Sequence, residues 1–245
     1  MASDKIICHF QSVICFEEAR CMKKFFTIFL LLSFHLSFAQ KNNNIINVPK
    51  GGSLIFDNTI NNSVWKSAKQ INIGGGNCIC FVQNGDYLFI GFRGNYEPWS
   101  HLYINNRSNV YVLHVTASMG RIIYNMNHYG TWQPDRQFNW KLRKNGSDYE
   151  ESGEINPDSF FEKEGWITCI NSEAEKKEVV YKINLKNYDR KNMYIAFVFG
   201  SKDKSYLYWP ETLKDDTLRP EIFTGYNPSP LMFDFRNWTL LKLTD

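Results

Sequence analysis

The chain lacks the motifs of the common enzyme classes. Its 245 residues contain no Gly-x-Ser-x-Gly, no His-Glu-x-x-His and no phosphate-binding glycine loop. Acidic residues are scattered, and no two of them form an evident pair of the kind that glycoside hydrolysis requires. The sequence therefore favours a binding protein over an enzyme, and it assigns no catalytic residue.

Charge of one sign is not concentrated anywhere in the chain. Lysine and arginine number 28 against 25 aspartate and glutamate, and the two signs are mixed along the sequence. A nucleic-acid footprint or a polybasic membrane anchor needs a basic stripe or cluster. We therefore expect no nucleic-acid partner and no electrostatic attachment to a membrane.

Long hydrophobic runs are also missing. The most apolar stretch, Phe25–Phe34, has about ten residues, whereas a transmembrane helix needs about 20. Two lysines precede this stretch and small residues follow it, which predicts a signal peptide over 22–39 with cleavage before Gln40. The predicted mature protein is secreted or periplasmic. It has no lipid anchor, because a lipoprotein would need cysteine in place of Gln40.

Residues 1–21 precede a complete signal peptide that has its own methionine, Met22. This stretch contains three acidic residues, which is unusual for the basic start of a signal peptide. We interpret 1–21 as an extension that arises from a start codon assigned too early; a genuinely long leader is the alternative. Residues 40–52 are then expected to be a polar linker and 53–245 one domain.

Few cysteines remain after the leader. Three of the six lie within residues 1–39, which leaves Cys78, Cys80 and Cys169. An odd number allows one internal disulfide and one free thiol. Cys78 and Cys80 would share one face of a strand, so either could pair with Cys169, and the sequence leaves this choice open. No histidine lies at ligand spacing from the Cys-x-Cys pair, and we predict no metal.

Short apolar runs separated by turn residues fill the predicted domain, and 16% of all residues are aromatic. Many short strands at such spacing indicate an all-β fold, here a two-sheet antiparallel β-sandwich. One short helix is expected over 156–164, where Asn156 caps, Pro157 starts and Gly165 stops it. The expected strands are 53–57, 78–83, 87–93, 101–105, 110–116, 121–125, 137–143, 166–171, 179–185, 193–200 and 238–243.

A sequence motif covers about forty residues, Leu54–Arg93. Asp57 follows an apolar residue and opens a turn, Trp65 and Ala68 form a Trp-x-x-Ala element, and Asp86 begins a strand that reads Asp-Tyr-Leu-Phe. This order of elements resembles the opening of the family 9 carbohydrate-binding modules and the related DOMON domains. The later part of the chain looks like a divergent bacterial branch of such exported sandwiches.

The resemblance implies a two-sheet antiparallel sandwich in a superfamily that binds sugars or, in some members, haem. Two positions depart from the pattern, because Asn58 stands where the family has glycine and Phe89 where it has tyrosine. The sugar-binding members hold a glycan between aromatic side chains. Those side chains do not map onto this chain position by position, so none is carried over.

Two loops concentrate aromatic residues where strand alternation does not require them. We expect Trp99 and Trp132 to stack on a sugar, with Glu97, His128 and Asp135 in polar contact with its hydroxyl groups. The alternative is that the two tryptophans cover the ends of the sandwich. A third candidate group precedes Pro210 and consists of Tyr206, Tyr208 and Trp209.

The predicted function is that of a non-catalytic exported domain that binds carbohydrate or a similar small ligand at its loop end. One alternative is a hydrolase or lyase that acts on glycans, with two carboxylates about 5–10 Å apart. Another is a haem-binding electron-transfer domain with a methionine–histidine axial pair. No haem spacing is present, and His114 lies in an apolar strand where a core histidine is expected. We therefore predict no cofactor.

Overall fold

The described strands form two sheets in one unit of the chain. The chain divides into 1–43 and 44–245, and the computed structural model describes only residues of the second unit. The described residues are 45–52, 56, 60, 63–95, 99–106, 108–116, 118–135, 139–142, 157–171, 175–200, 206–211, 213 and 233–243. The predicted signal peptide and Glu97 lie outside these ranges.

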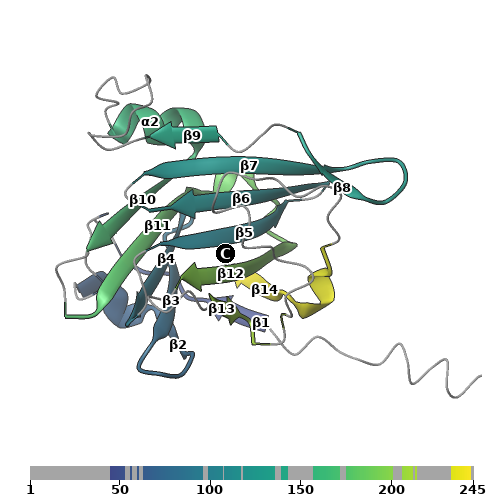
Figure 1. Cartoon of the computed structure of the whole chain (residues 1–245). Helices are drawn as coiled ribbons and strands as arrows, with labels where there is room; N and C mark the ends of the chain where they lie inside the picture. Colours follow the sequence, from purple (N-terminus) through teal and green to yellow (C-terminus); the bar gives the residue numbers. More distant parts are fainter. Residues whose placement is uncertain are drawn as a thin grey trace, which may run out of the picture. The chain divides into compact units, whose positions relative to one another are not determined.

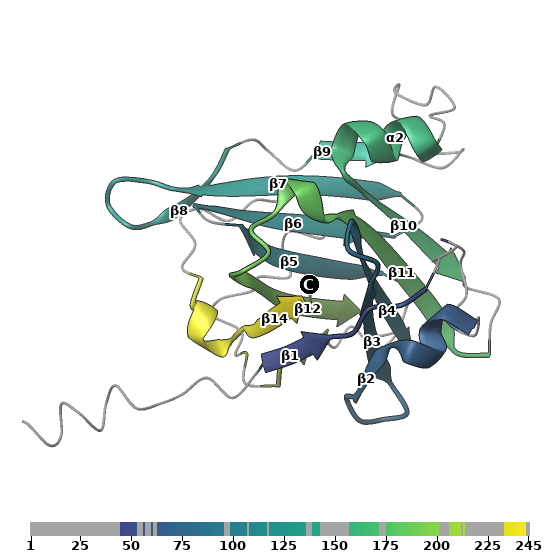
Figure 2. The ribbon, with the colours of Figure 1, turned by 180° about the vertical axis from the view of Figure 1, so that it is seen from behind.

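The larger sheet has nine strands and the smaller has five (Figures 1 and 2). In spatial order the larger contains β1 (Ile45–Val48), β14 (Thr239–Leu243), β12 (Met193–Gly200), β5 (Ser100–Asn106), β6 (Asn109–Val115), β7 (Met119–Met126) and β8 (Trp132–Pro134), while β13 (Tyr206–Trp209) also pairs with β12 and β9 (Asn139–Leu142) with β7. The smaller contains β10 (Trp166–Asn171), β11 (Lys177–Asn184), β4 (Tyr87–Gly94), β3 (Cys78–Gln83) and β2 (Lys69–Asn72).

The predicted two-sheet β-sandwich with one short helix is confirmed. The strands within each sheet pair antiparallel, except that β1 pairs parallel with β14. Helix α2 (Pro157–Glu164) starts at the expected proline, and Gly165 ends it with a φ of 73°. Single 3-10 turns occupy Ser63–Ser67, Leu185–Asn187 and Phe235–Asn237. Among the described residues, no helix is long and apolar enough to span a membrane.

Four short strands were not predicted from the sequence: β1, β2, β8 and β13. Strand β1 lies inside the stretch 40–52 that was expected to be a linker, so that expectation is corrected at Ile45–Val48. Its residues alternate in burial, because Ile46 and Val48 are buried while Ile45 and Asn47 are exposed. Four residues are too few for a clear period-two signal. Of the expected strand 53–57 only Phe56 is described, and it lies outside any strand.

The core between the sheets is built from alternate residues of central strands. Strand β12 sends Ile195, Phe197 and Phe199 toward the smaller sheet, and β4 sends Phe92 back toward them. The rings of Phe92 and Phe199 stack with centroids 3.9 Å apart. Each such fully buried side chain contributes about 1.5–3 kcal/mol through the hydrophobic effect.

The outer face of the smaller sheet is covered by the 3-10 turn Ser63–Ser67. Trp65 from this turn and Ile60 pack over Gly91 of β4, where a Cβ atom would lie 3.0 Å from both side chains. Glu178 of β11 fixes the same segment, because its Oε2 accepts a hydrogen bond from the Ile60 N–H (3.2 Å) while its Oε1 pairs with Arg93 Nε (2.8 Å). Trp65 therefore lies over a sheet face rather than at an end of the sandwich.

All three described cysteines are free thiols. Cys169, Val180, Gly91 and Cys80 follow one another in one row across the smaller sheet. Three strand spacings separate the two cysteines in this row, which is about 14 Å. Disulfides need Cα atoms within about 7 Å, so the pairing of Cys169 with Cys78 or Cys80 that the sequence left open does not occur.

His101 of β5 and His114 of β6 form a buried pair on the outer face of the larger sheet. They are direct partners in the ladder, and their ring centroids lie 4.3 Å apart. Burial lowers the pKa of His114 to about 3, although a hydrogen bond with the Ser100 backbone opposes this shift. Burial, and then the neighbouring His114, hold the pKa of His101 well below 6.5. Both imidazoles are therefore neutral at pH 7, as expected for core histidines.

This pair predicts acid sensitivity of the fold. The unfolded chain takes up protons at both histidines below pH 6.5 while the folded chain does not, so the free energy of unfolding falls as pH falls from about 6.5 toward 3. The fall is about 2 kcal/mol between pH 6 and pH 5 for two such groups. Denaturant unfolding at several pH values measures it. His114→Gln should halve the slope over this interval, and a flat wild-type profile would contradict the assignment.

Candidate functional site

Trp99 and the group around Trp132 lie at opposite ends of the larger sheet. Trp99 directly precedes β5, whose first residue pairs with the end of β6, which in turn pairs with the start of β7. His128 lies in the connection from the other end of β7 to β8, which extends beyond the sheet in Figure 1, and Trp132 is the first residue of β8. Seven to eight residues of strand separate the two ends, about 25 Å. Of the predicted site residues that the structure describes, Trp99 therefore lies apart from His128 and Trp132.

Trp132 is part of the hydrophobic interior and not an exposed stacking platform. Its side chain is 2% exposed, and its ring lies 5.5 Å from that of Phe233 and 5.6 Å from that of Phe235. Trp238 and Tyr124 belong to the same aromatic cluster. The alternative stated above, that this tryptophan covers the sandwich, agrees with its position, and the prediction that it stacks on a ligand is corrected.

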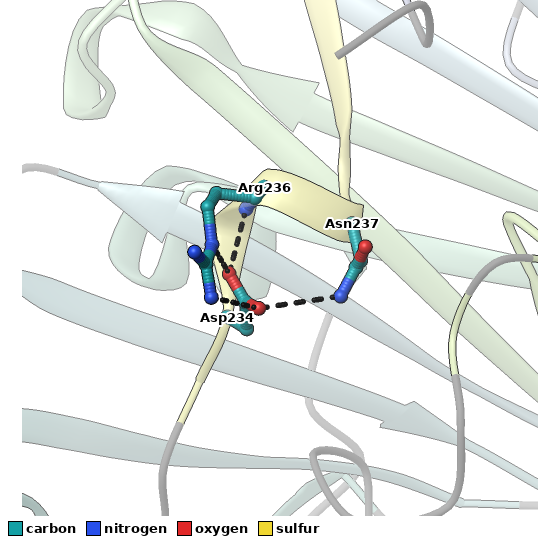
Figure 3. A network of polar contacts seen from close by, with 3 residues as sticks. All are labelled: Asp234, Arg236 and Asn237. Carbon is teal, nitrogen blue, oxygen red and sulfur yellow. Dashed lines mark hydrogen bonds and ion pairs between the residues drawn. The ribbon is translucent and has the colours of Figure 1, made fainter. Parts of the chain in front are cut away.

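Asp234, Arg236 and Asn237 form a network of polar contacts in the segment that carries Phe233 and Trp238 (Figure 3). Asp234 accepts hydrogen bonds from the Arg236 N–H, from two guanidinium nitrogens of Arg236 at 2.8 and 2.9 Å, and from Asn237 Nδ2. The hydrogen bond from Arg236 holds the pKa of Asp234 below its usual range. The turn directs Phe233 and Trp238 against the sheet. Aromatic side chains therefore cover this half of the outer face of the larger sheet, which we call the closed half.

His128 is exposed in the turn that connects β7 to β8, and Asp135 is exposed directly after β8. The Asn127 side chain accepts hydrogen bonds from the N–H groups of Tyr129 and Thr131, which shapes a tight turn. The His128 ring lies 3.7 Å from that of Tyr129, which is 79% exposed.

Trp99 is instead joined by two aromatic residues from a distant part of the sequence. Strand β13 pairs with β12, and Tyr206 lies opposite Gly200, whose N–H bonds to the Trp99 carbonyl oxygen (3.3 Å). The Trp99 and Tyr206 rings meet edge to face at 5.9 Å, and Tyr208 follows at 6.4 Å from Tyr206. Tyr206 is 39% exposed and Trp99 is half-buried. We call Trp99, Tyr206 and Tyr208 the aromatic surface.

Gly200 makes this arrangement possible. A Cβ atom at this position would overlap the indole ring of Trp99, so only glycine lets the ring lie across β12. In the sequence, Trp99 and the tyrosines are separate candidates, and no local pattern brings them together. The signal that could have done so is the small residue at the end of the apolar strand 193–200.

Trp209, the third member of the group before Pro210, points the other way. Its ring lies 5.8 Å from that of Phe81, in the core between the sheets. Strand alternation explains the split, because Tyr206 and Tyr208 take one face of β13 while Leu207 and Trp209 take the other. Among the described residues, no three His, Cys, Asp or Glu side chains are grouped as a metal site would require.

Comparisons with known proteins find similarity to solved structures. No protein-family model and no curated protein matches the chain. The chain is similar in structure to family 9 carbohydrate-binding modules. One from Caldicellulosiruptor kristjanssonii, in complex with cellotriose, has a TM-score of 0.40 at 10% identity, and the match covers 81% of this chain and 93% of the other. A family 9 module from the same organism in complex with glucose has a TM-score of 0.41 at 10% identity, over 82% of this chain and 95% of the other.

A third structure comes from Bacteroides uniformis ATCC 8492 and is provisionally described as a carbohydrate-binding protein. Its TM-score is 0.47 at 9% identity, and the match covers 82% of this chain and 99% of the other.

The two tryptophans should differ in their effect on stability. Trp132→Ala removes a buried ring and should lower the free energy of unfolding by about 3–5 kcal/mol. Trp99→Ala removes a half-buried ring at the edge of the sheet and should cost about 1–2 kcal/mol. Urea unfolding of the two variants beside the wild type measures both. Equal losses would contradict the different positions of the two rings.

Proposed function

We propose that the chain is a non-catalytic carbohydrate-binding domain whose ligand stacks on the aromatic surface. The observation that carries this proposal is the meeting of Trp99 with Tyr206, from segments about 100 residues apart, at a sheet end where Tyr206 remains exposed. An aromatic side chain that only fills the core would be buried and would not remain at the surface. An aromatic residue kept at the surface in a group is typical of a binding site.

Sugar rings suit this surface for a physical reason. One face of a pyranose presents C–H groups, which pack on the face of an indole or phenol ring, while its hydroxyl groups need polar partners at the rim. The two tyrosine hydroxyl groups can supply such partners as donors and acceptors. Glu97, two residues before Trp99, is the proposed carboxylate partner. His128 and Asp135 form no part of this site.

Two of the solved structures named above are complexes with cellotriose and with glucose. As part of the proposal, we infer that this chain also binds a carbohydrate. The support comes from the aromatic surface and from the sequence resemblance over Leu54–Arg93. The leader predicted over 22–39 would place the domain outside the cytoplasm. Extracellular or periplasmic glycans are then the ligands to test first.

Binding should depend on the aromatic surface. A glycan array identifies a ligand, and calorimetry with that ligand compares the variants Trp99→Ala, Tyr206→Ala and Tyr208→Ala with the wild type. We expect a loss of at least about tenfold in affinity for Trp99→Ala, because stacking on a large ring contributes about 1.4 kcal/mol or more. Tyr129→Ala is the matched control, since it removes an exposed ring at the other end of the sheet.

The outcomes separate the alternatives. Unchanged affinity in all three variants, or a loss only in Tyr129→Ala, would reject the aromatic surface as the site. Shorter saccharides released on long incubation would contradict a non-catalytic domain and favour the hydrolase or lyase. Absence of binding to any glycan on the array would reject carbohydrate as the ligand class.

A further inference from the structure

The three rings of the aromatic surface share one central member, Tyr206. Its ring centroid lies 5.9 Å from that of Trp99 and 6.4 Å from that of Tyr208. Tyr206 is exposed and the other two side chains are half-buried, so solvent reaches all three. Each spacing is similar to the length of one sugar unit in a glycan chain. Neighbouring units of one chain can therefore contact neighbouring rings of the surface.

The planes of these rings are strongly inclined to one another. The angle between the planes of Trp99 and Tyr206 is 65°, and the angle between those of Tyr206 and Tyr208 is 55°. A sugar stacks when its C–H face lies parallel to an aromatic ring. Three coplanar rings could all contact the flat face of a crystalline polysaccharide, whereas rings inclined in this way cannot lie parallel to one flat face together.

The path from ring to ring also changes direction. Trp99 and Tyr206 lie in one row across the strands, because the Gly200 N–H bonds to the Trp99 carbonyl oxygen and Tyr206 pairs with Gly200. Tyr208 lies two residues further along β13, on the same face as Tyr206. The first step therefore crosses the strands and the second follows one strand. A straight, ribbon-shaped glycan cannot follow both steps, while a chain that winds can.

The fold sets these orientations before a ligand binds. The Trp99 ring lies against the backbone of Gly200, where a Cβ atom would overlap it. Tyr206 packs edge to face on that ring, and both tyrosines belong to a strand that pairs with β12 over its whole length. Among the described strands, β13 pairs with β12 alone, so no further strand lies beyond the tyrosines. A preformed surface reduces the entropy cost of ordering side chains on binding.

We propose that the aromatic surface selects a single glycan chain that winds, with successive sugar units on Trp99, Tyr206 and Tyr208. This inference rests on the proposed function and adds the shape of the ligand to it. Amylose-type and laminarin-type glucans have this shape, because their successive rings are rotated in one sense. A cellulose-type chain forms a flat ribbon that packs into crystals. The surface discriminates against such ribbons because they stack on fewer of the three rings.

Calorimetry with gluco-oligosaccharides of three linkages tests this selection. The amylose, laminarin and cellulose series each run from glucose to the hexasaccharide, so the sugar is constant and only linkage and length differ. We expect the affinity in the amylose or laminarin series to rise at least about tenfold from glucose to the trisaccharide, because two further rings are engaged. The cellulose-type trisaccharide should bind about tenfold more weakly than that trisaccharide, since it loses these stacking contacts. Microcrystalline cellulose should not retain the protein.

Tyr208→Ala separates the third ring from the rest of the surface. This variant should bind glucose about as well as the wild type, and its affinity for the trisaccharide should fall about threefold to tenfold. Tyr208→Phe keeps the ring and should retain most of the trisaccharide affinity, which shows that the ring itself is required. Tyr129→Ala again serves as the control and should leave the whole series unchanged. Circular dichroism checks that each variant is folded.

The outcomes distinguish this inference from the proposed function. Equal affinities for glucose and the trisaccharide, tighter binding of the cellulose series, retention on microcrystalline cellulose, or binding of neither the amylose nor the laminarin series would overturn the selection by shape. The proposed function would still stand after any of these results if binding of a glycan depended on Trp99. A protein that binds no glycan on the array would reject both.

Discussion

The burial of strand β12 on both of its faces is the constraint on which the rest of the structure depends. Its inner face, Ile195 to Phe199, meets the smaller sheet, and its outer face carries Ala196 and Val198. A strand that is apolar on both sides needs a cover on the outside as well. The C-terminal segment supplies it at one end through Trp238 and its neighbours, and Trp99 lies across the other end, over Gly200.

This division explains why one half of the outer face is structural and the other is available for a ligand. At the closed half, Trp132, Phe233 and Trp238 are buried, and the Phe233 ring lies 5.5 Å from that of Trp132. At the open half, Trp99 directly precedes β5, and Tyr206 and Tyr208 belong to β13, which pairs with β12. Tyr206 meets Trp99 edge to face and still reaches solvent. Both halves contain tryptophan, so the residue type does not distinguish them. The proposed function follows from the exposure of the rings, which are covered on one half and reach solvent on the other.

The long, strongly alternating strands and the single helix could be predicted from the sequence, because period-two burial and proline and glycine boundaries are local signals. The four-residue strands β1 and β13 could not, since their pairing is decided by partners far along the chain. For the same reason Trp132 was assigned to the site: a tryptophan next to a turn has no local mark of burial, and Phe233 covers it from about 100 residues away. Trp99 and Tyr206 were each identified, but their contact depends on long-range pairing.

The most direct measurement of the central claim is a titration of the ¹⁵N-labelled protein with the saccharide that it binds, followed through the indole N–H signals of its seven tryptophans. The account predicts that the Trp99 signal shifts in a saturable manner while those of the buried Trp132, Trp166 and Trp238 stay in place. Saturable shifts at Trp132 without a change at Trp99 would contradict it.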